Sequence, residues 1–213
     1  MQQNQIYQSI LDGQQQGKHM LAILVDPDKG DNAQFEKTAL LCNEQHVDFL
    51  LTGGSLITNH RLDTCIETLK KHSNIPVLLF PGNNLQISPL ANGILLLSLI
   101  SGRNPEMLIG QHVIAAPVLK KTSLEIIPTG YILVESGRIT SVLYMSGTHP
   151  IPYDKPDIAL CTALAGEMLG LKLIYLEAGS GADKHVSLEM IKVVKENIHV
   201  PLIVGGGIRT AQQ

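Results

Sequence analysis

The feature that most constrains the fold is a regular alternation of short aliphatic runs with longer segments of helical periodicity. The runs are rich in Leu, Ile and Val and stop at glycine, proline or acidic residues, which is typical of buried strands. The expected strands are 19–25, 47–54, 75–82, 93–101, 125–135, 171–179 and 200–207, with Pro128 and Gly130 interrupting the fifth. The expected helices are 31–45, 61–72, 104–116, 155–170 and 187–198. Buried strands separated by helices predict an α/β fold with a parallel sheet and helices outside it.

Two architectures have this pattern, a doubly wound open sheet and a (β/α)8 barrel. A doubly wound dinucleotide-binding sheet has its glycine motif after the first strand, but here that strand is followed by Asp-Pro-Asp-Lys-Gly at 26–30. Glycine-rich loops instead follow the second, sixth and seventh strands, at 53–54, 179–181 and 205–207. In a barrel the functional loops are spread over the carboxyl ends of the strands, so the pattern favours a TIM-type barrel.

A chain of 213 residues is expected to form a single barrel domain over 1–213. A full barrel needs an eighth strand, and the chain stops within Gly-Gly-Gly-Ile-Arg-Thr-Ala-Gln-Gln, where a seventh helix would begin. We therefore expect a modified TIM (β/α)8 barrel whose C-terminal strand and helix are missing from the chain as given. A seven-stranded barrel is the alternative.

Composition excludes several classes of function. A formal net charge of −3 supplies no basic surplus for general nucleic-acid binding. The three cysteines are isolated, without the spacing of a metal site, and they favour a reducing compartment. The N-terminus lacks the pattern of a secretory signal, and the longest apolar stretch, 93–100, is too short to cross a bilayer. We expect a cytoplasmic protein without a transmembrane segment.

Asp26 follows the first expected strand directly, at the position where a barrel presents its catalytic groups. A carboxylate there can hold Mg²⁺, which usually binds one or two carboxylates together with substrate phosphate oxygens. Ser55, after the glycine pair of the neighbouring strand, offers a hydroxyl to a metal or a phosphate. An Asp-Pro turn and a plain strand-to-helix turn would leave the same signatures, so both readings stay open.

The loops at 177–182 and 205–209 follow the sixth and seventh strands. Backbone N–H groups in glycine-rich turns bind anions, and barrels often hold phosphate at their late strands. Two such loops in succession predict a bound phosphate, with tight turns that bind no ligand as the alternative. Glu177 is itself an anion at the start of the first loop, so the ligand of this loop must suit both an anion site and a neighbouring carboxylate.

Five motifs follow one another along the chain: Ile-Leu-Val-Asp-Pro-Asp-Lys, Leu-Leu-Thr-Gly-Gly-Ser-Leu-Ile-Thr, Leu-Leu-Phe-Pro-Gly-Asn, Tyr-Leu-Glu-Ala-Gly-Ser-Gly-Ala and Leu-Ile-Val-Gly-Gly-Gly-Ile-Arg-Thr. In this order and spacing they resemble the motifs of geranylgeranylglyceryl phosphate synthase. The related heptaprenylglyceryl phosphate synthases share the fold. The resemblance covers nearly the whole chain. It implies a Mg²⁺-dependent prenyltransferase that joins the C3 hydroxyl of sn-glycerol 1-phosphate to a polyprenyl diphosphate, most simply geranylgeranyl diphosphate, and releases diphosphate for ether-lipid synthesis.

The resemblance also assigns roles to residues. It implies Asp26 and Ser55 as the metal-site residues. The chemistry of the implied reaction requires a base for the attacking hydroxyl, and we expect Glu177 to be that base and Tyr175 to hydrogen-bond the glycerol. The implied substrate-binding set is Tyr175, Leu176, Glu177, Ala178, Gly179, Ser180, Gly181, Gly206 and Gly207. A homo-oligomer and transient contact with a membrane surface for the lipid product are expected as well. Two alternatives stay open: another phosphate-binding barrel enzyme, such as a sugar-phosphate isomerase or lyase, and a non-catalytic truncated barrel that serves as a binding or interaction module.

Overall fold

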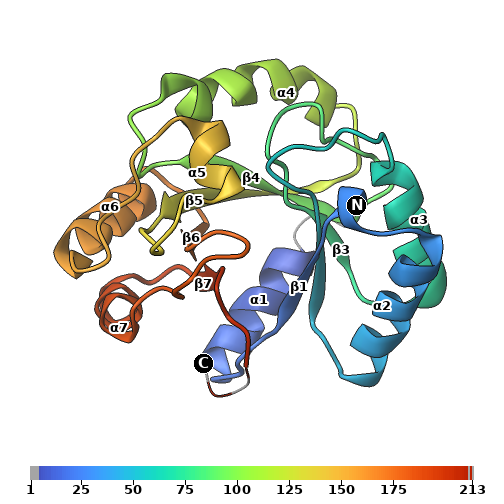
Figure 1. Ribbon diagram of the computed structural model, residues 1–213, viewed down its shortest axis with the longest axis horizontal. Helices are drawn as coiled ribbons and strands as arrows, with labels where there is room; N and C mark the ends of the chain where they lie inside the picture. The colour runs from blue at the N-terminus through green and yellow to red at the C-terminus, as the bar shows by residue number, and fades with distance from the viewer. Residues whose placement is uncertain (1–4, 211, 213) are drawn as a thin grey trace. The chain divides into compact units, whose positions relative to one another are not determined.

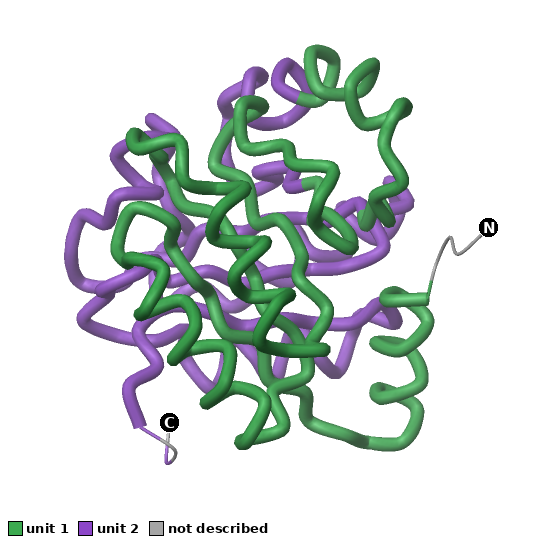
Figure 2. Tube along the Cα trace, turned by 90° about the vertical axis from the view of Figure 1, so that its right-hand side faces the viewer, with its two compact units in different colours: residues 1–96, 112–127 green, residues 97–111, 128–213 purple. Residues whose placement is uncertain are grey.

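The computed structural model describes residues 5–210 and 212, and the chain divides into two compact units (Figure 2). The first unit comprises residues 1–96 and 112–127, and the second comprises 97–111 and 128–213.

The first unit is built on parallel strands with helices between them (Figure 1). Its elements are α1 (Gln5–Gln15), β1 (Ala22–Val25), η1 (Pro27–Lys29), α2 (Asn32–Glu44), β2 (Phe49–Thr52), α3 (Leu62–His72), β3 (Val77–Leu79), the first part of β4 (Gly93–Leu99), most of α4 (Gln111–Leu119) and the start of β5 (Glu125–Leu133). Leu51 of β2 pairs with Leu24 of β1 on one side and Leu78 of β3 on the other. Leu50 and Leu79 pack into a core with Phe35 of α2, so the helices cover one face of these strands.

The second unit repeats the strand–helix pattern. It contains the end of β4, η2 (Glu106–Gly110), most of β5, α5 (Ser141–Ser146), α6 (Pro156–Met168), β6 (Leu173–Glu177), α7 (Leu188–Asn197) and β7 (Leu202–Gly205). Strands β5, β6 and β7 are parallel, and Glu177 pairs with Leu133 on one side and Gly205 on the other. The carboxyl ends of the three strands therefore lie next to one another.

All seven strands follow one another in chain order, from β1 to β7. Within residues 5–210 and 212 there is no eighth strand. The expected α/β class, a modified TIM barrel without its eighth strand in this chain, is confirmed.

Alternation along β6 decides which side chains are available for chemistry. Ile174 and Leu176 are fully buried in a cluster with Ala159 of α6 and Met190 of α7. Successive side chains of a strand point to opposite faces. Tyr175 and Glu177 therefore point away from these helices, and Glu177 ends β6 at its carboxyl end, where a barrel enzyme binds its ligands.

The fifth strand differs from its expected form, because β5 runs without a break from Glu125 to Leu133. Pro128 precedes the first registered pair of β5 and β6, Thr129 with Leu173, so its missing N–H breaks no ladder bond to β6. Its carbonyl accepts a hydrogen bond from Lys172. A Cβ at Gly130 would lie 2.8 Å from Ile100 Cδ1, so the glycine allows close packing and does not interrupt the strand.

The helix expected at 104–116 consists of the π-helical segment η2 followed by α4, which continues to Leu119. Asp31 and Ser187 cap α2 and α7, as their sequence positions suggest. Two helices had no sequence prediction, α1 and α5. The backbone N–H groups of Ile6 and Tyr7 donate to the buried carboxylate of Glu125, which fixes the start of α1. No helix among the described residues is long and apolar enough to cross a membrane.

Candidate functional site

Glu177 is the last residue of β6, and its side chain is 6% exposed. Its Oε1 atom accepts a 2.6 Å hydrogen bond from the backbone N–H of Gly179, and the hydroxyls of Tyr131 and Tyr175 donate to the same carboxylate. Burial away from water raises its pKa from an ordinary 4.5 to about 7, although these three hydrogen bonds favour the ionised form. A carboxyl group with a pKa near the operating pH is suited to general-base chemistry.

Two tyrosines flank this carboxylate. Tyr131 of β5 and Tyr175 of β6 are registered partners, and their ring centroids are 5.5 Å apart. Burial raises the pKa of both hydroxyls, and the neighbouring Glu177 raises them further, so both are neutral donors at ordinary pH. A Cβ at Gly205 would lie 2.1 Å from the Tyr175 hydroxyl, so only glycine leaves room for this ring beside β7.

The glycine that follows β7 also lies against the carboxylate. Gly206 has φ of +82°, and a Cβ there would lie 2.4 Å from the Gly179 nitrogen and 2.6 Å from Glu177 Oε1. A side chain would therefore enter the space between the two loops. Gly207 has φ of +72°, and a Cβ added there would lie 2.7 Å from the Lys184 carbonyl oxygen. The glycines after β7 thus bring its backbone against the loop that follows β6.

The loop after β6 forms a tight turn in which Ala182 N–H donates to the Gly179 carbonyl. Gly179 and Gly181 both have positive φ, of +96° and +76°. Ser180 and Gly181 are exposed, whereas Gly179 is buried beneath Thr140. Backbone N–H groups at the exposed tip of such a turn are suited to bind an anion.

Two residues of the expected substrate-binding set have their side chains in the core. Leu176 is fully buried, Ala178 is 3% exposed, and both belong to the cluster that packs against α6 and α7. Only their backbone atoms are available to a ligand on the opposite face. The structure brings Tyr175 and Glu177 together with Gly205, at the end of β7, and Gly206 after it.

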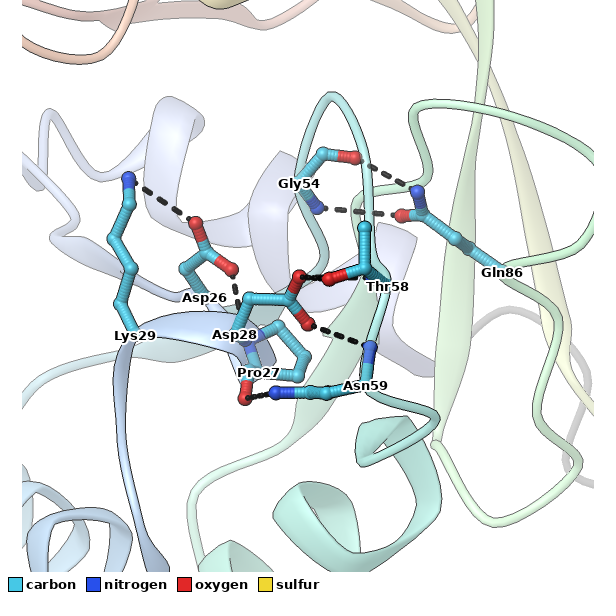
Figure 3. A network of polar contacts seen from close by, with 8 residues as sticks. All are labelled: Asp26, Pro27, Asp28, Lys29, Gly54, Thr58, Asn59 and Gln86. Atoms are coloured by element: carbon cyan, nitrogen blue, oxygen red, sulfur yellow. Dashed lines mark hydrogen bonds and ion pairs between the residues drawn. The ribbon is translucent and has the colours of Figure 1, made fainter.

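The other predicted group belongs to the first unit and consists of Asp26, which Figure 3 shows, and Ser55. Asp26 follows β1, and its side chain is 20% exposed. Its Oδ1 accepts from the backbone N–H of Asp28 at 3.0 Å, and its Oδ2 pairs with Lys29 Nζ at 3.1 Å. A Cβ at Gly54 would lie 3.4 Å from Asp26 Oδ1, so the glycine loop after β2 lies directly beside this carboxylate.

Gln86 holds that glycine loop in place. Its side chain is 4% exposed, and its Oε1 accepts from Gly54 N–H at 3.2 Å and from Gly82 N–H at 3.1 Å. Its Nε2 donates to the Gly54 carbonyl at 2.8 Å (Figure 3). One buried amide therefore ties the loop after β2 to the loop after β3.

Asp28 has a structural role in the same region. Its carboxylate accepts from the backbone and hydroxyl of Thr58, both at 2.8 Å, and from the backbone of Asn59 (Figure 3). Burial alone would raise the pKa of Asp28, but these hydrogen bonds outweigh it, and the pKa is lowered. This carboxylate is committed to the 58–59 loop, whereas the Asp26 carboxylate, whose partners are Asp28 N–H and Lys29, is partly exposed.

The oxygen atoms at Asp26 and Ser55 are compatible with a magnesium ion that takes most of its ligands from a bound phosphate compound. Among the described residues, no group of three or more His, Cys, Asp or Glu side chains is placed to hold a metal. Mg²⁺ commonly binds through one or two carboxylates and substrate phosphates, without an all-protein cage. A partly exposed carboxylate next to a glycine loop, with the half-buried Ser55 following, meets that requirement.

Two residues that shape the candidate sites were not predicted from the sequence, Tyr131 and Gln86. Tyr131 could have been found as a polar-tipped aromatic residue within an aliphatic strand, but the expected break at Pro128 and Gly130 hid its register with Tyr175. Gln86 lies in a loop without periodicity, and only contacts over 32 residues of sequence reveal its role.

Comparisons with known proteins agree with this geometry. The PcrB family matches residues 14–213. The geranylgeranylglyceryl phosphate synthase of Spirosoma linguale is 55% identical over 197 residues, which are 92% of this chain and 79% of the relative. The enzyme of that name from Chitinophaga pinensis is 50% identical over 210 residues, which are 99% of this chain and 83% of the relative.

A solved structure extends the likeness to three dimensions. The crystal structure of (S)-3-O-geranylgeranylglyceryl phosphate synthase from Thermoplasma acidophilum, in complex with its substrate sn-glycerol-1-phosphate, superposes with a TM-score of 0.92 at 33% identity. The match covers 100% of this chain and 84% of that one. The chain therefore belongs to the PcrB family, together with the geranylgeranylglyceryl phosphate synthases, and its expected membership in this family of prenyl transferases is confirmed.

Proposed function

We propose that this protein joins the C3 hydroxyl of sn-glycerol 1-phosphate to C1 of geranylgeranyl diphosphate, forming an ether bond and releasing diphosphate. The observation that carries the proposal is the buried Glu177, whose pKa is about 7 and which lies beside two glycine loops. The names of the relatives and the glycerol phosphate bound to the Thermoplasma protein support the same substrate pair.

Glu177 acts as the base in this reaction. The bond between prenyl C1 and the diphosphate oxygen breaks, and its electron pair leaves with diphosphate. A lone pair of the C3 hydroxyl oxygen forms the new bond to C1, and the hydroxyl proton passes to the Glu177 carboxylate. With a pKa of about 7, a substantial fraction of this carboxylate is ionised at neutral pH and able to accept the proton.

The loops around Glu177 hold the glycerol phosphate. The Gly179 N–H donates to Glu177, so the phosphate contacts come from the exposed turn at Ser180 and Gly181 and from Gly206 and Gly207. The Tyr175 hydroxyl donates to the Glu177 carboxylate, so it would accept a hydrogen bond from a glycerol hydroxyl. Fixing the phosphate end determines which hydroxyl faces the prenyl carbon, which is a proximity effect.

Asp26, with Ser55, would hold Mg²⁺ together with the diphosphate of the prenyl substrate. When bound, the ion neutralises the charge that develops on the leaving diphosphate. The glycine loop beside Asp26 leaves its carboxylate accessible to a large anionic ligand.

Product analysis tests the proposal. The protein is incubated with Mg²⁺, sn-glycerol 1-phosphate and a ladder of prenyl diphosphates, and the products are identified by mass spectrometry while diphosphate is assayed in parallel. We expect one prenyl ether of glycerol phosphate and one diphosphate per turnover. The matched reaction with sn-glycerol 3-phosphate should yield far less product. Absence of an ether product with every prenyl length would reject the proposal.

We further propose that copies of this chain associate and that the assembly touches membranes only transiently to deliver its lipid product. Exposed apolar side chains of α4, Val113, Ile114 and Val118, support an associating surface. Sedimentation velocity on the wild type and on Val113→Lys tests this. A monomeric wild type would contradict the association.

A further inference from the structure

Tyr131 is the part of the Glu177 environment to which no role has been assigned. It lies in the middle of β5, 6% exposed, and its ring faces that of Tyr175 in the neighbouring strand. Its hydroxyl donates to the Glu177 carboxylate across the strand pair. Burying a phenol hydroxyl in a strand is unfavourable unless it finds a hydrogen-bond partner, and here the partner is the proposed base.

The two tyrosines differ in what else surrounds them. The Tyr175 hydroxyl lies over Gly205, at the boundary with the glycine loop that follows β7. Tyr131 comes from β5, on the opposite side of β6 from β7. Tyr175 is thus placed to touch a ligand held by the β7 loop, and Tyr131 reaches that ligand only through the carboxylate.

We infer that Tyr131 is a positioning residue, whose hydroxyl fixes the orientation in which the Glu177 carboxylate accepts the proton of the C3 hydroxyl. The inference rests on the proposed function. Three donors from three places then hold the carboxylate: Tyr131 from β5, Tyr175 from β6 and the Gly179 N–H from the following loop. Without Tyr131, only the amide and Tyr175 would hold the carboxylate, so it would turn away from the reacting hydroxyl more easily.

Among the described residues of its unit, the titratable side chains that act on Glu177 are these two hydroxyls, one on β5 and one on β6. The strand β7 contributes Gly205 and Gly206, which carry no ionisable group. Both tyrosines remain neutral at ordinary pH, because burial raises the pKa of each hydroxyl. A change in the titration of Glu177 upon removing the Tyr131 hydroxyl therefore reports the loss of that donor.

The first test is Tyr131→Phe, which keeps the ring contact with Tyr175 and removes only the hydroxyl. We expect kcat to fall about 10- to 100-fold, as for loss of a hydrogen bond to a charged group, with KM for sn-glycerol 1-phosphate changed less than about twofold. The acidic limb of the pH profile should move to higher pH, because a donor that favours the ionised carboxylate is gone. Tyr144→Phe, the same change at a tyrosine that is 79% exposed, should leave all three quantities unchanged.

A second readout does not depend on turnover. The carboxyl carbons of ¹³C-labelled glutamate are titrated by NMR, with the Glu177 signal identified by its absence in Glu177→Gln. The Glu177 pKa should be higher in Tyr131→Phe than in the wild type and equal to the wild type in Tyr144→Phe. Thermal melts verify that each variant is folded.

Two outcomes overturn the inference: an unchanged Glu177 titration in folded Tyr131→Phe, or a loss of activity that appears wholly in KM. A wild type that forms no ether product would overturn the proposed function instead. In that case the NMR titration still decides whether Tyr131 holds the carboxylate. Failure of the inference and failure of the proposed function therefore give different results.

Discussion

Oε1 of Glu177 accepts a 2.6 Å hydrogen bond from the backbone N–H of Gly179, two residues further along the chain. This contact turns the loop after β6 back toward the end of its own strand. It also uses one amide of the glycine-rich loop to hold the carboxylate, which leaves the later amides for an anion. The same contact explains how one loop could combine a negative side chain with the proposed phosphate site.

Activity should depend on the ionisation of Glu177. The pKa of this group is about 7, and only the ionised form can accept a proton, so kcat/KM is expected to rise with pH through about 7 and then level. The wild-type profile, measured in overlapping buffers at constant ionic strength, checks this. Glu177→Gln should lose most of its turnover at every pH. A variant with near-normal kcat would show that Glu177 is not the base.

Stability should depend on pH through the same group. The pKa in the folded chain is raised to about 7 from an ordinary 4.5, so the folded state binds the proton more tightly than the unfolded state does. The resulting stabilisation is complete below the unfolded pKa and is lost as pH rises through the folded pKa. Between pH 4.5 and pH 8, the free energy of unfolding of the wild type should fall by up to about 3 kcal/mol more than that of Glu177→Gln.

Urea denaturation of both proteins at several pH values measures this difference. Because Gln does not titrate, the variant supplies the pH dependence of the rest of the chain. A stability difference between the two proteins that stays constant from pH 4.5 to 8 would contradict the raised pKa.

Gly206→Ala should damage the site far more than an ordinary loop substitution. The new Cβ would lie 2.4 Å from the Gly179 nitrogen, at a backbone φ of +82°. We expect a loss of about 2–4 kcal/mol of stability, from left-handed strain together with overpacking, and a more than tenfold weaker affinity for sn-glycerol 1-phosphate. Denaturation and calorimetric titration provide the two measurements.

Gly170→Ala is the matched control. Gly170 has φ of +86°, but nothing lies within 4 Å of its Cβ position. The control substitution should therefore lower stability only by the left-handed backbone strain, about 1–2 kcal/mol, and leave ligand affinity unchanged. Equal effects of the two substitutions would argue against a close approach of the loops after β6 and β7.

Asp26→Asn should raise the Mg²⁺ concentration needed for half-maximal activity by at least about tenfold, because it removes the carboxylate proposed to hold the ion. Binding of sn-glycerol 1-phosphate should be largely retained. Asp28→Asn is the control, since the Asp28 carboxylate binds the 58–59 loop. The control should lower the melting temperature and leave the Mg²⁺ requirement in place. Equal Mg²⁺ curves for both variants would count against Asp26 as the ligand.

Gln86→Leu should destabilise the fold by about 3 kcal/mol, because it leaves Gly54 N–H, the Gly54 carbonyl and Gly82 N–H without their shared partner. Hydrogen exchange should become faster at the Gly54 and Gly82 amides specifically. Gln15→Leu, the same substitution at an exposed position, should change stability by less than about 0.5 kcal/mol. Unaltered exchange at Gly54 in Gln86→Leu would show that the amide does not hold this loop.

The sequence predicted most of the fold because its signals are local. Strand–helix alternation, the caps Asp31 and Ser187, and the glycine loops after strands all depend on neighbouring residues. The prediction was wrong at Pro128 and Gly130, where the local rule favours a break. Pro128 is tolerated because it precedes the first registered pair with β6, a fact that depends on a strand more than 40 residues away.

The sequence by itself determined the class of the fold, the family and the loops that hold the predicted site residues, since these follow from periodicity and motif order. Only the tertiary structure decided which side chains meet. Tyr131 and Tyr175 reach one carboxylate because β5 and β6 pair in a register that no local pattern encodes. Leu176 turns into the core although it lies between two site residues, because side chains alternate along a strand. The pKa of Glu177 is likewise a property of burial, which exists only after the chain has folded.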